Sequence, residues 1–121
     1  MEVLIDSSFI ISCMRKRIDF ISQLQEQGFT IKVPREVLQE MKDLHKSDRV
    51  SHEDRIAINV AFELIEKLKI KKMSLGNKSV DKGLIEKGRE GIYIASLDAG
   101  IKKQVPNKIV IFSSKGTVGV A

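Results

Sequence analysis

Residues 3–11 read VLIDSSFII and carry the clearest structural signal of this 121-residue chain. The apolar run over residues 1–5 stops at Asp6, which is typical of a strand in a parallel sheet that helices cover on both faces. Asp6 therefore stands at the carboxyl end of a predicted strand. After it, apolar residues recur at three- and four-residue steps and predict one helix, which Gly28 ends. These apolar residues are Ile11, Met14, Ile18, Ile21 and Leu24.

Farther along the chain, short apolar runs alternate with helical patterns. The further predicted strands are 29–33, 92–95 and 108–112, and the strand over 108–112 is expected to be the last one. Residues 70–75 are an ambiguous brief edge strand, and residues 115–121 are expected to form a tail or an edge segment. The predicted helices are 34–45, which Pro34 opens, 51–68, 79–87 and 99–104. Ser51 and Asp54 resemble a capping box, and the apolar stripe after them is Ile56, Val60, Leu64 and Leu68. This alternation predicts a three-layer α/β/α domain with a central parallel sheet, formed by residues 1–121.

The charge balance of the chain is basic. Lys and Arg number 21 and Asp and Glu 16, so the formal charge is +5. Such an excess is compatible with a polyanionic partner such as nucleic acid, although small basic domains also carry it for solubility. Aromatic residues make up 5% of the chain, which argues against a base-stacking platform for single strands.

Cysteine content and hydropathy exclude several classes. Cys13 is the single cysteine, which rules out an intrachain disulfide framework and a cysteine-rich zinc site. We expect it to be a small buried side chain rather than a reactive thiol. No run approaches the ~18 apolar residues of a membrane helix, and Glu2 and Asp6 interrupt the start of the chain where a signal peptide would be apolar. We therefore expect a cytoplasmic protein with no membrane partner.

Four acids are predicted to meet at one edge of the sheet. Asp6 and Asp98 each follow a strand, and the carboxyl ends of parallel strands share the edge where crossover loops converge. Glu40 borders the core-facing stripe of its helix, and Asp81 begins a helix, so both can reach that edge. Clustered carboxylates oppose folding unless a cation neutralises them, and a pocket of oxygen ligands suits Mg²⁺ or Mn²⁺. The sequence therefore predicts a divalent-metal site for phosphodiester hydrolysis, with the four acids as its catalytic and metal-binding residues.

Hydroxyl and basic side chains flank these acids. Ser7, Ser8 and Ser96 can hold a ligand carboxylate or a metal-bound water in place. Lys102 and Lys103 closely follow the last of the four acids and are the best candidates for contacts to RNA phosphates.

The same residues also have simpler explanations. Asp6 and Asp98 could only cap the helices that follow them, as in a doubly wound signalling or protein-binding domain. Glu40 could lie on a solvated helix face, and Asp81 could be a cap, as could the flanking serines. It is the joint placement of four acids at one edge that favours the metal site.

The motifs around the acids resemble those of the PIN-domain nucleases. VLIDSSFII resembles the family's first strand and its Asp-Thr-Asn type motif, here Asp6, Ser7 and Ser8. VPREVLQEM (33–41) resembles the second segment and places Glu40, and SVDKGLIEKG (79–88) resembles the third and places Asp81. IYIASLDAGIKKQV (92–105) resembles the fourth and places Ser96 and Asp98. The match spans nearly the whole chain in the family's order.

This resemblance implies an Mg²⁺- or Mn²⁺-dependent endoribonuclease with a four-carboxylate pocket, often a homodimer. The family includes VapC-type toxins, which have antitoxin partners, and ribosomal RNA processing enzymes, for which a ribosome-assembly partner is expected. SLDAGIKKQV is more similar to the processing group. The chain departs from the family at three places. Ser8 replaces the usual Asn, Lys82 stands where many members carry a second acid, and Ala99 and Gly100 stand where a further acid is common after Asp98. Fewer acidic residues argue against a second metal ion. A catalytically weak or inactive RNA-binding PIN module is the alternative.

Overall fold

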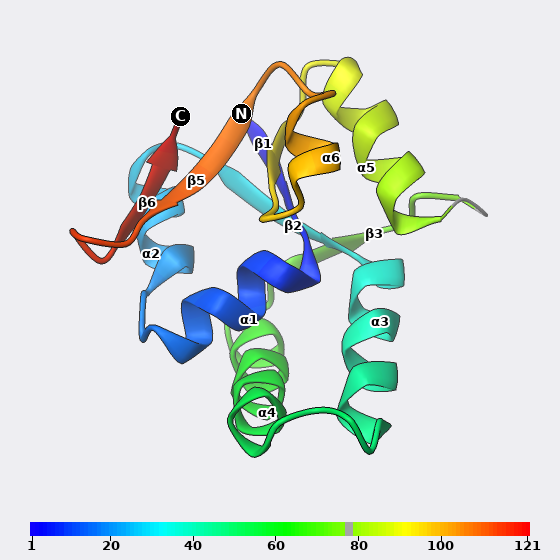
Figure 1. Cartoon of the computed structure of the whole chain (residues 1–121). Helices are drawn as coiled ribbons and strands as arrows, with labels where there is room; N and C mark the ends of the chain where they lie inside the picture. Colours follow the sequence, from blue (N-terminus) through cyan, green and yellow to red (C-terminus); the bar gives the residue numbers. More distant parts are fainter. Residues whose placement is uncertain (77–78) are drawn as a thin grey trace.

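The computed structural model of the protein describes residues 1–76 and 79–121, which form a sheet between layers of helices (Figure 1). The described strands are β1 (Glu2–Ile5), β2 (Thr30–Pro34), β3 (Lys71–Met73), β4 (Tyr93–Ala95), β5 (Lys108–Phe112) and β6 (Thr117–Val120). The described helices are α1 (Ser7–Arg15), α2 (Phe20–Glu26), α3 (Arg35–Lys46), α4 (His52–Lys67), α5 (Val80–Arg89) and α6 (Ala99–Lys102).

The strand order creates a switch in winding direction beside β1. The sheet runs β3-β2-β1-β4-β5-β6, and β1 to β5 are parallel. From β1 the chain winds outward to β3 and then returns to β4, on the other side of β1, so the winding direction changes between these two strands. There Val3 lies opposite Tyr93, and Ile5 lies opposite Ala95. In open α/β sheets, ligand sites form outside the carboxyl ends of the strands at such a switch point.

The helices cover both faces of the sheet and confirm the predicted three-layer architecture. α1, α3 and α4 pack together on one face, and α5 and α6 pack on the other (Figure 1). β1 lies between the two layers, and Val3, Leu4 and Ile5 are at most 1% exposed, which explains an apolar run without polar alternation. None of the helices in the described part of the chain is long and apolar enough to cross a membrane.

The predicted unbroken first helix is wrong, because the structure contains α1 and α2 in its place. Arg17 has a φ of 56°, in the left-handed region, and the Ile18 N–H donates to the Cys13 carbonyl at 2.9 Å, which closes the end of α1. The Asp19 carboxylate then caps α2 by accepting from the Ser22 N–H at 3.1 Å. Because the apolar stripe continues across this break, periodicity alone did not reveal it.

The apolar stripe predicted for α4 is wrong in three of its four residues, and only Leu64 packs against the core. Ile56 is 49% exposed, Val60 41% and Leu68 47%. The buried residues of α4 are instead Ala57, Ile58, Ala61 and Ile65. The two alanines are small and allow α1 to pack closely against α4. Both sides of this helix are apolar, so the spacing did not show which side faces the core. The predicted cap is correct in its forward half, since Ser51 Oγ accepts from the Asp54 N–H at 3.1 Å.

The edges of the sheet differ from the prediction in one strand. The ambiguous edge strand over 70–75 is present as β3, and of the two alternatives for 115–121, a tail or an edge segment, the structure shows the edge strand β6. The prediction that the strand over 108–112 is the last one is wrong, because β6 turns back and pairs with β5 antiparallel. Antiparallel pairing of two consecutive strands needs only a tight turn between them, whereas a further parallel strand would need a crossover.

Two glycines allow α5 to pack tightly. A Cβ at Gly83 would lie 2.8 Å from Leu75 Cβ, and a Cβ at Gly88 would lie 2.3 Å from Val105 Cγ1. A glycine inside a helix costs about 1 kcal/mol relative to alanine, and here this close packing requires it. α5, which carries Asp81 in its first turn, is therefore fixed against its neighbours.

Candidate active site

The candidate site lies at the carboxyl ends of β1 and β4, where the winding direction changes. Asp6 directly follows β1, and its backbone N–H donates to the carbonyl of Ala95, the last residue of β4, at 2.9 Å. Within the described part of the chain, Asp6 (6% exposed) and Ser96 (1%) are the buried polar residues. A buried polar pair at this point of the fold distinguishes it from the apolar core around it.

Serine groups hold the Asp6 carboxylate in place. The Ser96 hydroxyl donates to Asp6 Oδ2 at 2.8 Å, and the Ser7 N–H donates to Asp6 Oδ1 at 2.8 Å. The Ser8 hydroxyl lies 3.4 Å from Oδ2 and accepts from the Leu97 N–H at 3.2 Å. The carboxylate is therefore fixed from β4 as well as from α1.

Glu40 reaches the same place from α3. The Ser7 hydroxyl donates to Glu40 Oε1 at 3.2 Å, so Ser7 contacts Glu40 with its side chain and Asp6 with its backbone. The prediction that Glu40 borders the core is wrong in one respect, because its side chain is exposed. Glu40 directly precedes Met41, the last buried residue of α3, and its contact with Ser7 places it at the edge where Asp6 lies.

The carboxylates of this edge act on one another. Burial raises the pKa of Asp6; hydrogen bonds from Ser96 and Ser7 oppose this, and the negative charge of Asp81 adds to it. The pKa of Glu40 is also raised, by burial first, then by the charge of Asp6 and, more weakly, that of Asp81. The structure therefore brings Asp6, Glu40 and Asp81 into one electrostatic group.

Asp98 has a different environment from the other three acids. Its Oδ1 accepts from the Ile101 N–H at 3.0 Å and caps α6, which is the simpler explanation weighed from the sequence. Its own N–H donates to Ser96 Oγ at 3.1 Å, and Ser96 in turn donates to Asp6. Asp98 thus lies at the same edge, and its carboxylate is engaged with its own helix.

The donor set suits a hard divalent cation, although the acids are spread apart. Within residues 1–76 and 79–121, no three Asp, Glu, His or Cys side chains lie close enough to hold a metal ion together. Carboxylate oxygens are nevertheless the ligands that Mg²⁺ and Mn²⁺ prefer, and mutual repulsion between Asp6 and Glu40 would be relieved by a cation. Asp6 is the fixed member, whereas Glu40 and Asp81 are exposed side chains that can change rotamer.

Glu36 is a structural acid that we did not predict. Burial disfavours its charge, but hydrogen bonds from the Leu75 N–H, at 3.1 Å to each carboxylate oxygen, and from Ser74 Oγ, at 3.2 Å, lower its pKa. Glu36 thereby fastens the segment after β3 to the first turn of α3. Its spacing of one helical turn from Glu40 was the available signal, and it did not separate a structural acid from a functional one.

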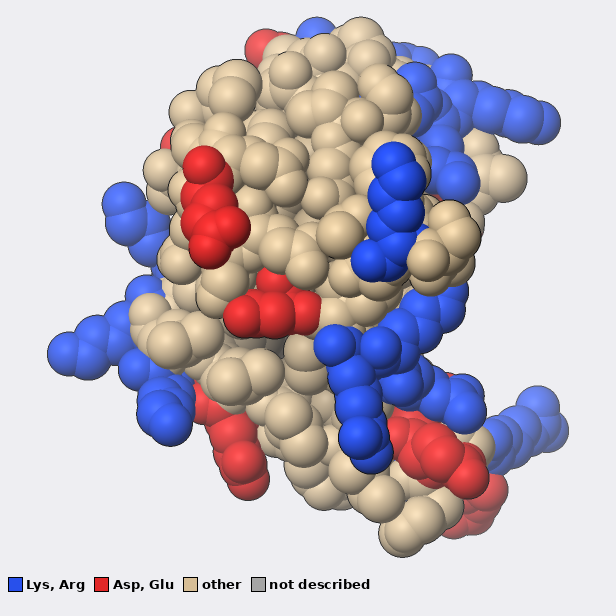
Figure 2. Space-filling view, turned by 90° about the vertical axis from the view of Figure 1, so that its left-hand side faces the viewer, with Lys and Arg blue, Asp and Glu red and all other residues tan. Residues whose placement is uncertain are grey.

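The basic side chains are dispersed. Figure 2 shows Lys and Arg side chains projecting from several parts of one face, with Asp and Glu side chains among them. Lys102 is half-buried at the end of α6 and Lys103 is exposed, and neither ammonium group contacts an acid of the described part of the chain. Their contact with RNA remains a prediction.

Cys13 is fully buried, as expected. Burial raises the pKa of its thiol to about 12. The thiol is therefore protonated at neutral pH and belongs to the core.

Comparison with known proteins identifies the fold. No protein-family model matches the chain, and no curated protein matches it. Among solved structures, the PIN domain endonuclease Utp24 matches with a TM-score of 0.73 and 16% sequence identity, over 98% of this chain and 90% of that one. At this identity the likeness concerns the backbone, and with the strand order and layers described above it shows that the chain has a PIN-like fold.

Proposed function

We propose that the protein is a divalent-metal-dependent endoribonuclease that hydrolyses RNA phosphodiester bonds. The observation that carries the proposal is the buried Asp6 carboxylate, held by Ser96 and Ser7 at the switch point and acted on by the charges of Glu40 and Asp81. The similarity of the fold to the PIN domain endonuclease Utp24 supports the reaction class. RNA is the substrate that the basic excess of the chain favours.

Each residue has a defined part in this proposal. Asp6 is the fixed ligand of the cation, Glu40 and Asp81 complete its coordination, and Asp98 contributes when its carboxylate leaves the α6 cap. When bound, Mg²⁺ or Mn²⁺ lowers the pKa of a water and neutralises charge on the scissile phosphate. Ser96 and Ser7 keep the Asp6 carboxylate oriented, so that it does not reorganise during the reaction.

The alternative function is RNA binding without cleavage. It is favoured by one observation, that the Asp98 carboxylate caps α6 while the remaining acids of the described part are not grouped for a metal ion. Both functions are compatible with the fold, and they differ in whether the protein cleaves the RNA that it binds.

Cleavage of a labelled RNA in Mn²⁺ or Mg²⁺ tests the proposal. The wild-type protein should cleave structured or unstructured RNA, and Asp6→Asn should lower the rate by at least 100-fold, the usual scale for an electrostatic catalytic group. Asp48→Asn, which removes an exposed acid from the α3–α4 loop, is the matched control and should cleave like wild type. RNA binding without cleavage supports the alternative, and equal cleavage by wild type and Asp6→Asn contradicts the nuclease assignment.

The RNA that is cut separates the two cellular roles. Preference for a ribosomal RNA precursor supports a processing enzyme with a ribosome-assembly partner, whereas cleavage of other cellular RNAs supports a toxin with an antitoxin. A homodimer and a cytoplasmic location belong to the same proposal. Sedimentation velocity of the purified chain tests the dimer.

A further inference from the structure

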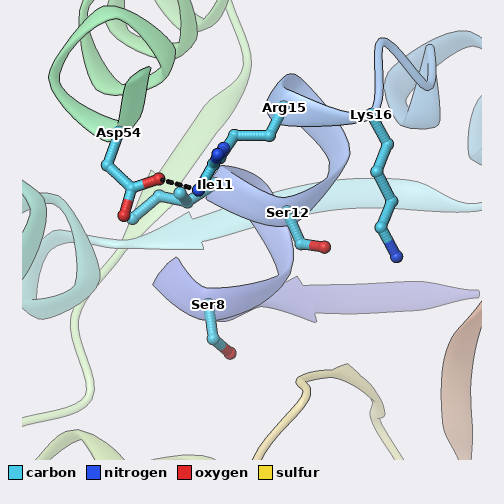
Figure 3. Close-up of a pocket in the computed structure, with 6 residues that line it drawn as sticks. All are labelled: Ser8, Ile11, Ser12, Arg15, Lys16 and Asp54. Carbon is cyan, nitrogen blue, oxygen red and sulfur yellow. Dashed lines mark hydrogen bonds and ion pairs between the residues drawn. The ribbon is translucent and has the colours of Figure 1, made fainter. Parts of the chain in front are cut away.

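A basic pocket adjoins the candidate site and shares Ser8 with it. It has a volume of about 560 Å³ and opens along one side of α1 (Figure 3). Its walls are Ser8, Ile11, Ser12, Arg15 and Lys16 of α1 and its end, with Asp54 from α4. Figure 3 shows the Ser8 and Ser12 hydroxyls and the Lys16 ammonium projecting from α1 on the same side.

The pocket holds hydrogen-bond donors that are mostly unused. Arg15 Nη1 lies 3.1 Å from Asp54 Oδ1, and the Arg15 side chain is 48% exposed, so the other N–H groups of its guanidinium are available. Lys16 Nζ donates to Ser113 Oγ at 2.9 Å and has two further N–H groups. The Ser12 hydroxyl has no hydrogen-bond partner among the described residues. Two cations against one carboxylate leave the pocket with a positive charge.

One residue joins this pocket to the acids. Ser8 lines the pocket, and its hydroxyl also lies 3.4 Å from Asp6 Oδ2. Ser8, Ser12 and Lys16 follow one another at four-residue steps, so they lie on one side of α1. Each step is about 6 Å along the helix axis, so the donors extend over about 12 Å from the acids. This length is suited to a chain of repeating anionic groups rather than to a single anion.

The chemistry of the walls favours phosphate contacts. None of the lining residues is aromatic, so the pocket offers no aromatic platform for bases. Arg, Lys and Ser side chains are the groups that bind phosphate and sugar oxygens without reading sequence. The pocket is similar in size to those that hold one small organic molecule, ~300–1,000 Å³, so it can admit part of one strand.

We propose that this pocket binds the phosphate backbone of a single-stranded RNA segment adjoining the bond to be cut. Arg15, Lys16 and Ser12 are its positioning residues, and the entering phosphate displaces Asp54 from Arg15. This inference rests on the proposed function for its substrate. It assigns strand binding to α1 in addition to the predicted Lys102 and Lys103.

Binding of a labelled single-stranded RNA without divalent metal tests the pocket apart from catalysis. The double variant Arg15→Gln/Lys16→Gln should weaken binding about tenfold. It should also reduce the slope of log K against log salt by about 1.4, since each phosphate contact to a single strand contributes about 0.7. The matched control is Lys87→Gln/Arg89→Gln, which removes the same charge from α5 on the other side of the sheet and should retain the wild-type slope.

Asp54→Asn gives a result of the opposite sign. It removes the carboxylate that competes with the RNA phosphate for Arg15, so RNA should bind several-fold more tightly. A variant that is merely misfolded would bind RNA more weakly, so tighter binding cannot come from loss of folding. Its backbone N–H still donates to Ser51, so the cap of α4 is retained.

The outcomes separate this inference from the proposed function. If Arg15→Gln/Lys16→Gln binds RNA more weakly and the wild-type protein does not cleave RNA, the RNA-binding pocket is supported and the nuclease activity is contradicted. Cleavage by wild type with the two double variants binding alike would overturn the pocket and leave the nuclease. Equal affinity for a blunt RNA duplex, or binding of an acidic peptide in place of RNA, also contradicts the pocket as a single-strand site.

Discussion

The hydroxyl of Ser96 and the carboxylate of Asp6 are 90 residues apart in sequence and are joined by a buried hydrogen bond of 2.8 Å. This bond connects the carboxyl ends of β4 and β1, the two strands between which the winding direction changes. Ser96 also accepts from the Asp98 N–H, so one hydroxyl links two of the predicted acids.

Ser96→Ala should destabilise the fold and alter the pH dependence of cleavage. Loss of a bond to a buried carboxylate costs about 1–3 kcal/mol, measurable by urea denaturation. Because this bond lowers the pKa of Asp6, its removal should raise that pKa further and shift the acidic limb of the pH–rate profile to higher pH. Ser22→Ala, at an exposed position in α2, is the control. A variant with wild-type stability and pH profile would contradict the role of Ser96.

Divalent metal should stabilise the protein most at neutral pH. The raised pKa values of Asp6 and Glu40 exceed their ordinary values of 3.8 and 4.5. Their contribution to metal-free stability is therefore complete below those values and is lost as pH rises through the folded pKa values. Bound metal should reverse this loss, by about 2.7 kcal/mol at a hundredfold excess over Kd.

Thermal unfolding with Mn²⁺ and with a chelator, at acidic and neutral pH, measures this effect. Asp6→Asn should abolish the metal-dependent rise in Tm, and Asp48→Asn should retain it. A rise of equal size in all three proteins would show that the ion binds elsewhere.

Glu36→Gln should loosen the segment before α5 in a pH-dependent way. The pKa of Glu36 is lowered, so its stabilising effect is present above its ordinary value of 4.5 and is lost as pH falls through the folded pKa. We expect a loss of about 1 kcal/mol at pH 7, allowing for partial exposure, that disappears in acid. Chemical denaturation of wild type and variant across this pH range provides the measurement. The exposed Glu63→Gln in α4 is the control.

Cys13 should resist alkylation in the folded protein. Its side chain is fully buried and its pKa is about 12, so thiolate is scarce at pH 8. Iodoacetamide labelling followed by mass spectrometry should show modification in denaturant and almost none in buffer. Rapid labelling of the native protein would mean that α1 opens readily.

The strand pattern was predictable because its signals are local. An apolar run that ends in Asp6 identifies a strand buried on both faces, and the position of Asp98 after a second run predicts a shared edge. The break after α1 was not predictable from periodicity, since it depends on the left-handed backbone at Arg17 and on the cap at Asp19. The buried side of α4 was missed because Ile56 and its neighbours form an apolar stripe of their own.

The candidate site was predictable in position and less so in detail. Topology alone brings Asp6 and Asp98 to one edge, whereas the use of the Asp98 carboxylate depends on how α6 begins. Glu36 and Glu40 occupy neighbouring turns of one helix, and only their partners distinguish them: Leu75 for Glu36 and Ser7 for Glu40. Such partners come from distant segments and leave no local pattern.

Glu36 and Glu40 both belong to α3. A shift of α3 along its axis would therefore break the hydrogen bond between Glu40 and Ser7 and the one between Glu36 and Leu75 together. Glu40 and the backbone at Leu75 are thus both held from α3. The position of α3 therefore sets both where Glu40 stands beside Ser7 and where the Leu75 backbone is held.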